Sequence, residues 1–80
     1  MAAHSLVLYG KADCHLCHEA RDLLMRLQAE YPFTLDEVNI TRDPALEARY
    51  FLSIPVIVVD GTLELEAPVH ESEVRAALRR

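Results

Sequence analysis

Two kinds of apolar pattern alternate along this chain of 80 residues, and their order limits the folds that it can adopt. The short apolar runs that are typical of strands are residues 5–9, 33–38, 55–59 and 62–66. The segments in which apolar residues recur at helical spacing are residues 16–29, 44–50 and 71–79. The predicted order is β-α-β-α-β-β-α, which favours a single α/β domain over residues 1–80, with a four-stranded mixed sheet and helices on both faces.

The connections between the strands predict their directions. A helix separates each of the first three strands from the next, and right-handed helical crossovers are expected to make those three strands parallel. Asp60-Gly61 is typical of a type I′ hairpin turn, so the fourth strand is expected to run antiparallel to the third. The leucines of residues 62–66 are predicted to face the core and the glutamates to face solvent, where charge protects an edge strand.

Side-chain chemistry predicts how the helices begin and which faces they bury. Asp43 is a good N-cap and Pro44 suits the first helical position, so the second helix is expected to begin there. Val74 and Leu78 are predicted to anchor the last helix. The apolar residues expected to share the buried face of the first helix are Leu16, Ala20, Leu23, Leu24 and Leu27.

Composition argues against several classes of function. The net charge is −5, whereas nucleic acids and anionic membranes attract basic surfaces, so we expect neither as a partner. We find no apolar run that approaches the length of a membrane span, and no basic segment followed by a long apolar one, as a secretory signal would have. The expected location is the cytoplasm, where two cysteines rarely form a structural disulfide.

The two cysteines, Cys14 and Cys17, fall where the first strand gives way to the first helix. A thiolate at Cys14 would lie against the N-terminal N–H groups of that helix, which stabilise negative charge. Cys17 lies one turn later on the same face, within reach of the first sulfur. We therefore predict that Cys14 is the attacking thiolate and Cys17 the resolving thiol. The candidate sources of positive charge nearby are Lys11, His15 and His18.

These features resemble those of the glutaredoxins and of the wider thioredoxin superfamily. The strand, the Lys11-x-x-Cys14-x-x-Cys17 sequence and the following helix are similar to the active site of that family. Ile54-Pro55 occupies the place of the (T/S/R)-V-P motif, and the predicted order of elements is that of the minimal thioredoxin fold. The chain resembles in particular small bacterial glutaredoxin-like proteins with a C-x-L-C active site. The resemblance implies a thioredoxin-like fold and thiol–disulfide oxidoreductase activity.

The resemblance also implies a substrate site and partners. The Ile54–Pro55 peptide bond is expected to be cis, with the N–H and C=O groups of Ile54 turned outward to pair with an extended substrate. The expected substrate-binding residues are Lys11, His15, Ile54 and Pro55. The implied substrates are protein disulfides or glutathione mixed disulfides. We expect a monomer without a metal or a tightly bound cofactor, which takes electrons from a reductase or from glutathione.

Two departures from the glutaredoxin pattern bear on specificity. His15-Leu16 replaces the usual Pro-Tyr between the cysteines, which leaves the reduction potential open. Residues 67–71 replace a glycine-rich turn that binds glutathione in the family. In this segment Pro68 removes a backbone donor, and Glu71 would repel a glutathione carboxylate. Glutathione binding is therefore left open by the sequence.

Other functions fit the same cysteines. Cys14-x-x-Cys17-His18 is also the pattern of c-type haem attachment, which requires export and is usual in helical proteins. The two cysteines with nearby histidines would supply a zinc site, although the histidines lack the usual downstream H-x₃₋₅-H spacing. An iron–sulfur cluster shared across a dimer is a further alternative for a glutaredoxin-like protein. A redox-silent adaptor that only keeps the fold is the remaining alternative.

Overall fold

The computed structural model describes residues 3–80, and each predicted helix and strand is present there. The strands are β1 (His4–Gly10), β2 (Phe33–Asn39), β3 (Val56–Val59) and β4 (Leu63–Leu65). The helices are α1 (His15–Leu27), α2 (Pro44–Tyr50) and α3 (Glu71–Leu78). A 3₁₀ turn that the sequence did not predict, η1 (Ile40–Arg42), lies between β2 and α2. The predicted order of elements is confirmed.

The sheet has the strand order β2-β1-β3-β4, and its directions differ from the prediction. β1 and β2 are parallel, but β3 runs antiparallel to β1, so the expectation of three parallel strands is wrong. α1 has 13 residues and rises about 20 Å, which returns the chain to the end of the sheet where β1 began. α2 has seven residues and rises only about 10 Å, whereas the seven-residue β2 spans about 23 Å. The chain therefore enters β3 from the end at which it left β2.

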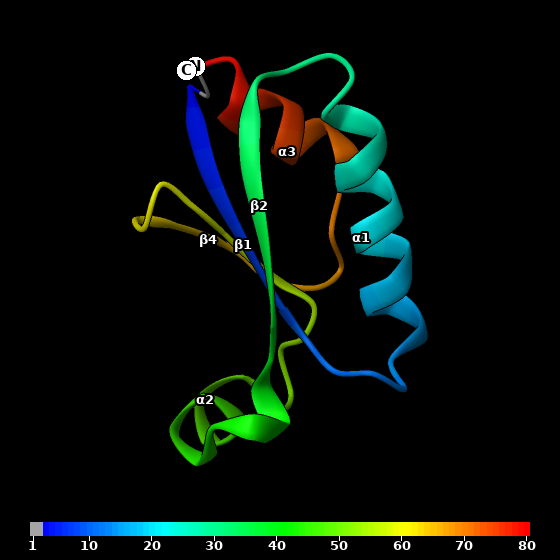
Figure 1. Ribbon diagram of the computed structural model, residues 1–80, viewed down its shortest axis with the longest axis vertical. Helices are drawn as coiled ribbons and strands as arrows, with labels where there is room; N and C mark the ends of the chain where they lie inside the picture. The colour runs from blue at the N-terminus through cyan, green and yellow to red at the C-terminus, as the bar shows by residue number, and fades with distance from the viewer. Residues whose placement is uncertain (1–2) are drawn as a thin grey trace.

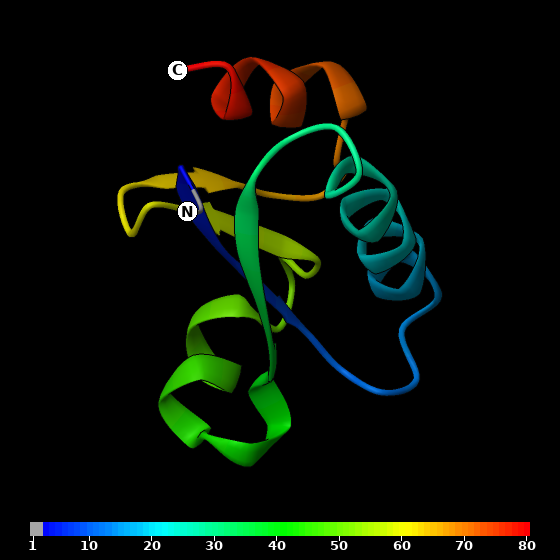
Figure 2. The ribbon, with the colours of Figure 1, turned by 45° about the horizontal axis from the view of Figure 1, so that its top comes forward.

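Helices cover both faces of the sheet, as predicted (Figures 1 and 2). On one face α1 and α3 pack over the strands, and the buried side chains of this larger core are Leu6, Leu8, Ala20, Leu24, Leu27, Phe33, Ile57, Val59, Val74, Ala77 and Leu78. On the other face η1 and α2 pack on the sheet, and the buried side chains there are Ile40, Tyr50 and Val56. The predicted anchors of α3 are thus confirmed.

The buried face of α1 differs from the predicted one at the start of the helix. Leu16 is 55% exposed, so the prediction that it shares this face is wrong. The buried residues of the helix are Cys17, Ala20, Leu24 and Leu27. At about 100° per residue, Leu16 lies within about 40° of Ala20 and Leu27, so its angle does not explain its exposure. Leu16 is the second residue of α1, and its position in the first turn places it at the end of the buried stripe. Its side chain is left on the surface next to the cysteines.

Local signals for turns and helix starts are confirmed. Asp60 and Gly61 have φ values of 54° and 74°, and positive φ at both central residues is what a type I′ turn requires. Asp43 is the N-cap of α2, where its Oδ1 accepts the N–H of Ala45 at 2.9 Å, and Pro44 follows as the first helical residue. These short-range interactions set the ends of β3, β4 and α2.

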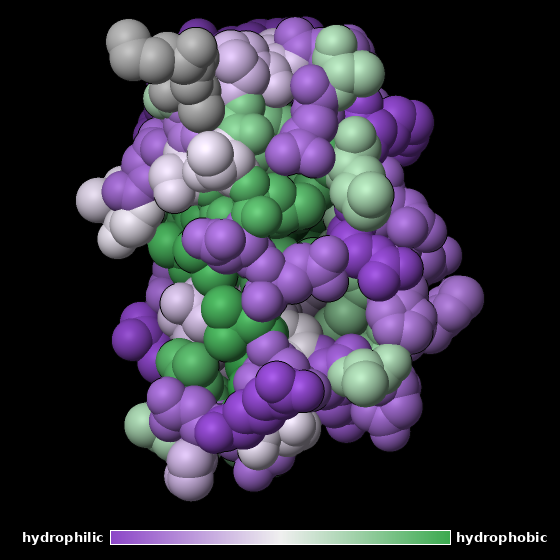
Figure 3. All heavy atoms as spheres, in the orientation of Figure 1, coloured by the Kyte–Doolittle hydropathy of each residue, from purple (hydrophilic) through white to green (hydrophobic). Residues whose placement is uncertain are grey.

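Strands β2 and β4 form the two edges of the sheet, and β4 follows the predicted pattern of half-buried leucines and exposed glutamate. On the face shown in Figure 3, apolar atoms lie in the middle and hydrophilic residues surround them. Within residues 3–80, no helix is both long enough and apolar enough to cross a membrane.

A buried histidine joins the start of β1 to the turn between β3 and β4. Nδ1 of His4 lies 2.7 Å from Oδ2 of Asp60, and Oδ1 of Asp60 accepts the N–H of Ser5 at 2.9 Å. The hydrogen bond to Asp60 raises the pKa of His4 above its ordinary value. The same bond holds the pKa of Asp60 below its ordinary value. The pair is therefore most stabilising when both residues are charged.

We expect this pair to make the free energy of unfolding depend on pH. His4, whose pKa is raised on folding, contributes stability that is complete below pH 6.5 and is lost as the pH rises through its folded-state pKa. Asp60, whose pKa is lowered, contributes stability that is present above pH 3.8 and is lost as the pH falls. Urea unfolding between about pH 3 and pH 9 measures both effects. Asp60→Asn keeps an oxygen for the Ser5 N–H, so it should remove the loss above pH 6.5. The same loss in that variant would contradict the assignment.

Candidate active site

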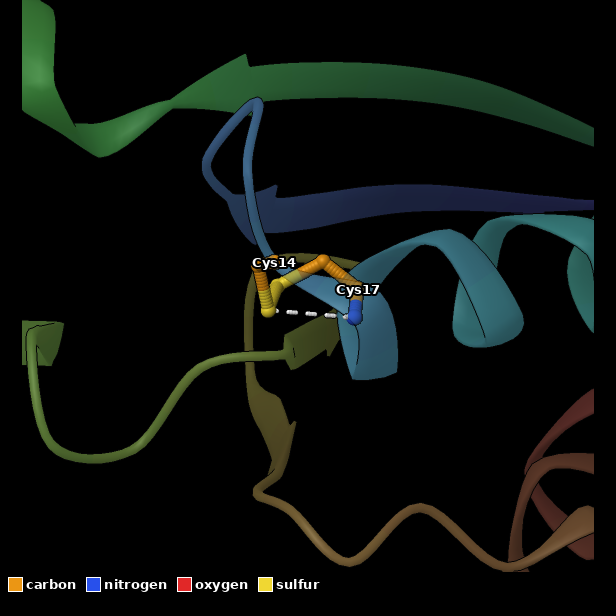
Figure 4. Close-up of a disulfide and its surroundings, with 2 residues drawn as sticks. All are labelled: Cys14 and Cys17. Carbon is orange, nitrogen blue, oxygen red and sulfur yellow. Dashed lines mark hydrogen bonds between the residues drawn. A yellow bond between two sulfur atoms is a disulfide. The ribbon is translucent and has the colours of Figure 1, made fainter.

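Cys14 and Cys17 form a disulfide at the N-terminus of α1, with their Cα atoms 5.2 Å apart (Figure 4). Cys14 is the N-cap, and its extended backbone (φ −108°, ψ 108°) lets the side chain turn back over the first turn of the helix. Its Sγ accepts the N–H of Cys17 at 3.2 Å. In the reduced protein the same N–H can donate to a Cys14 thiolate, and hydrogen bonding to the charged form favours it.

The helix adds to this effect. The first turn of α1 contains no acidic residue, and Arg26 lies in its last turn. Because Cys14 is the N-cap, its sulfur lies at the positive end of the helix macrodipole, and no carboxylate in the first turn offsets this field at a thiolate. The N–H of Cys17 is one of the N-terminal N–H groups that make this end of α1 positive, so the hydrogen bond and the helix field together favour negative charge on the first sulfur.

The two cysteines differ in accessibility. Cys14 is partly exposed, whereas Cys17 is only 4% exposed and packs against Gly10 at the end of β1. A methyl group on Gly10 would lie 2.9 Å from the Cys17 sulfur, so the strand approaches this sulfur too closely for any other residue without a shift. A substrate sulfur can reach Cys14 from solvent, but Cys17 can be reached easily only by Cys14 itself. The attacking role of Cys14 and the resolving role of Cys17 stay predictions.

The basic residues near the cysteines lie in two places. Lys11 and His18 line a cavity of about 590 Å³ that also includes Cys17 and Arg21. No ion pair joins Lys11 to a carboxylate within residues 3–80. His15 points outward with 86% of its side chain exposed, and its Nε2 lies 3.6 Å from Oε1 of Glu19. The roles predicted for Lys11 and His15 in substrate binding stay predictions.

The segment before β3 contributes Ile54 and Pro55. Their peptide bond is cis, as the resemblance implied. Pro55 is buried and lines a groove together with Leu16. The N–H of Ile54 donates to the C=O of Tyr50 at 3.1 Å, so this N–H is already used within the protein. Of the two backbone groups of Ile54 that were predicted to pair with a substrate, we therefore keep only the C=O as a predicted contact.

Sequence reasoning missed two parts of this region. The first is Gly10, because a glycine directly after a predicted strand and four residues before Cys14 is a signal for a close approach of the backbone. The second is Pro68, which the sequence analysis treated only as a missing donor, whereas residues 67–69 form one wall of the groove beside Pro55. No local pattern signals this second contact, because the residues are brought together by the sheet.

The metal-binding alternative requires several ligands close together. Nowhere in residues 3–80 do three or more side chains of histidine, cysteine, aspartate or glutamate come close enough to hold a metal ion together. The cysteines of the disulfide and the histidines named above therefore do not form a ligand set in this conformation.

Comparison with known proteins gives a consistent result. The family model described as Glutaredoxin-like domain (DUF836) matches residues 5–79. The X-ray structure of target protein XcR50 from X. campestris is 36% identical, covers 92% of this chain and 95% of its own, and superposes with a TM-score of 0.79. The solution structure of protein Ne2328 from Nitrosomonas europaea is 30% identical, with 98% and 94% of the two chains covered and a TM-score of 0.83.

More distant structures share the fold alone. A mutant thioredoxin from Halobacterium salinarum is 16% identical, with a TM-score of 0.77 over 98% of this chain and 74% of that chain. The chain is thus similar to thioredoxin in architecture, and the thioredoxin-like α/β fold predicted from the sequence is confirmed.

Proposed function

Because the chain belongs to the glutaredoxin-like domain family, we propose that it is a thiol–disulfide oxidoreductase that works by dithiol exchange through Cys14 and Cys17. Family and disulfide together support a redox-type function. The observation that carries the finer proposal is the asymmetry of the two sulfurs at the start of α1. Cys14 is partly exposed and accepts a hydrogen bond that favours its thiolate, whereas Cys17 is buried.

The proposed reaction has two exchange steps. The Cys14 thiolate attacks one sulfur of a substrate disulfide, the substrate S–S bond breaks, and the other substrate sulfur leaves as a thiolate that takes up a proton. Cys17 then loses its proton and attacks Cys14, the mixed disulfide breaks, and the second substrate sulfur leaves as a thiol. Two electrons pass from the two cysteines to the substrate, and the protein keeps a Cys14–Cys17 disulfide. The same steps in reverse oxidise a substrate dithiol.

The proposal extends to partners. Substrates are protein disulfides or glutathione mixed disulfides, and the electron donor is a reductase or glutathione. We propose a cytoplasmic monomer without a tightly bound cofactor and without nucleic acid or membrane partners. The net charge of −5 supports the last point, because such partners attract positive charge.

Equilibration in redox buffers tests the function. The protein is incubated in graded mixtures of reduced and oxidised glutathione, quenched with acid, and its intact mass is measured. We expect a reversible change of two hydrogen masses, with a midpoint between about −200 and −300 mV. Cys14→Ser should show no internal disulfide under any condition. If both thiols of the parent protein stay free across the whole range, the redox function is wrong and an adaptor role takes its place.

A further inference from the structure

A groove of about 310 Å³ lies between α1 and the segment that leads into α3, and its lining includes Leu16, the second residue of α1, which lies between the two cysteines in the sequence. The apolar side chains that line it include Leu16, Leu23, Pro55, Pro68 and Val69. Leu16 forms one wall and, although apolar, is 55% exposed. An exposed leucine next to the reactive cysteines offers apolar surface to a bound molecule, because burying it there removes this surface from water.

The groove offers little to a carboxylate. Its only basic residue, Arg26, donates to Oε1 of Glu71 at 3.3 Å, and Glu71 also accepts from Nε of Arg75 at 2.8 Å. The cation of the groove is thus already neutralised. The N–H of Ala67 donates to the C=O of Ser53, and Pro68 has no N–H. A ligand carboxylate would therefore find neither a free cation nor a free backbone donor at these two positions.

The rim of the groove is negative instead. Glu19 lines the groove, and 61% of its side chain is exposed. Its contact within residues 3–80 is the exposed ring of His15 at 3.6 Å, which is longer than a hydrogen bond. The side of the groove nearest the first turns of α1 therefore attracts a basic group and repels an acidic one.

Building on the proposed function, we infer that the groove selects its substrate. It takes an extended segment of a protein that has an apolar side chain beside the reacting cysteine and a basic residue facing Glu19. The apolar side chain packs between Leu16, Pro55 and Val69, while the cysteine sulfur forms the mixed disulfide with Cys14. Glutathione, which has two carboxylates and no apolar side chain, is a poor substrate by the same reasoning.

Peptide disulfides test the selectivity. Three peptides, each with one cysteine joined to the same chromogenic thiol, carry leucine with lysine, leucine with glutamate, or serine with glutamate beside the cysteine. The fourth substrate is the glutathione disulfide of that thiol. Rates with the reduced protein are divided by rates with dithiothreitol, which removes differences in intrinsic reactivity. We expect the leucine–lysine peptide to react at least about 10-fold faster than the serine–glutamate peptide and the glutathione disulfide.

Matched variants locate the effect. Leu16→Ser should remove the preference for leucine, and Glu19→Gln should remove the preference for lysine over glutamate. The control is Met25→Ser, because Met25 is also apolar, lies on α1 and is 57% exposed, but is absent from the groove. It should keep both preferences.

The outcomes separate this inference from the proposed function. Equal normalised rates for all four substrates, faster reaction of the glutathione disulfide, or equal effects of Leu16→Ser and Met25→Ser would overturn the groove assignment and leave dithiol exchange intact. If none of the four substrates reacts faster with the parent protein than with Cys14→Ser, both proposals are overturned.

Discussion

Replacing Cys14 by serine is expected to reduce the rate of disulfide exchange by at least about 10³-fold. The reason is that Cys14 supplies the thiolate at the N-terminus of α1, where the N–H of Cys17 and the helix field stabilise its charge. A serine hydroxyl is not ionised near neutral pH and does not attack disulfides. The buried Cys17 cannot replace it, because it is only 4% exposed. Second-order rates with a chromogenic disulfide measure the loss.

Cys17→Ser is the companion variant, and it is expected to block the second exchange step instead of the first. The first exchange step should remain, so that the substrate stays attached to Cys14 and the mixed disulfide accumulates as a mass adduct. Release of the substrate would then require an external thiol. Turnover that uses both cysteines of the protein would be lost. If Cys14→Ser kept the parent rate, or if Cys17→Ser trapped nothing, the assignment of attacking and resolving cysteine would be wrong.

The second large effect is expected from Gly10→Ala. The new methyl carbon would lie 2.9 Å from the Cys17 sulfur and 3.0 Å from its Cβ, both closer than van der Waals contact allows. Cys17 is buried and held by α1, so the core must shift. Overpacking of this kind costs about 1–3 kcal/mol of unfolding free energy. Urea denaturation of the oxidised and the reduced protein measures this cost in each state.

The cost should depend on redox state. In the disulfide the Cys17 sulfur is held by its bond to Cys14, whereas the free thiol can rotate away from the added methyl group. The oxidised form therefore loses more stability than the reduced form. A difference of about 1 kcal/mol would shift the midpoint potential by roughly 20 mV toward easier reduction. Redox titration of the variant beside the parent protein gives this shift.

Gly61→Ala is the matched control. Gly61 has φ of 74° and no atom within 4 Å of an added Cβ, so its cost comes from backbone strain alone. This cost is about 1–2 kcal/mol, and it should be the same in both redox states because the turn does not contact Cys17. Equal losses in the two states for Gly10→Ala as well would contradict the proposed contact with the sulfur.

Local chemistry was predictable from the sequence. Asp60-Gly61 specifies its turn through positive φ at both positions, and Asp43-Pro44 starts α2 through a side-chain cap and a preset φ. The placement of Cys14 at the start of α1 follows in the same way from the change between strand and helix periodicity. Each of these features depends on interactions within a few residues, so it can be predicted without knowledge of the fold.

The arrangement of these elements relative to one another was not predictable in this way. The direction of β3 depends on whether α2 is long enough to return the chain along the sheet, which helical periodicity does not reveal. The exposure of Leu16, the contact between Gly10 and Cys17, and the bond between His4 and Asp60 join residues or surfaces through packing of the sheet and helices. The groove beside the disulfide has the same origin, because its walls come from three separate parts of the chain. Such contacts join residues that are far apart in the sequence, so a pattern within a few residues does not predict them.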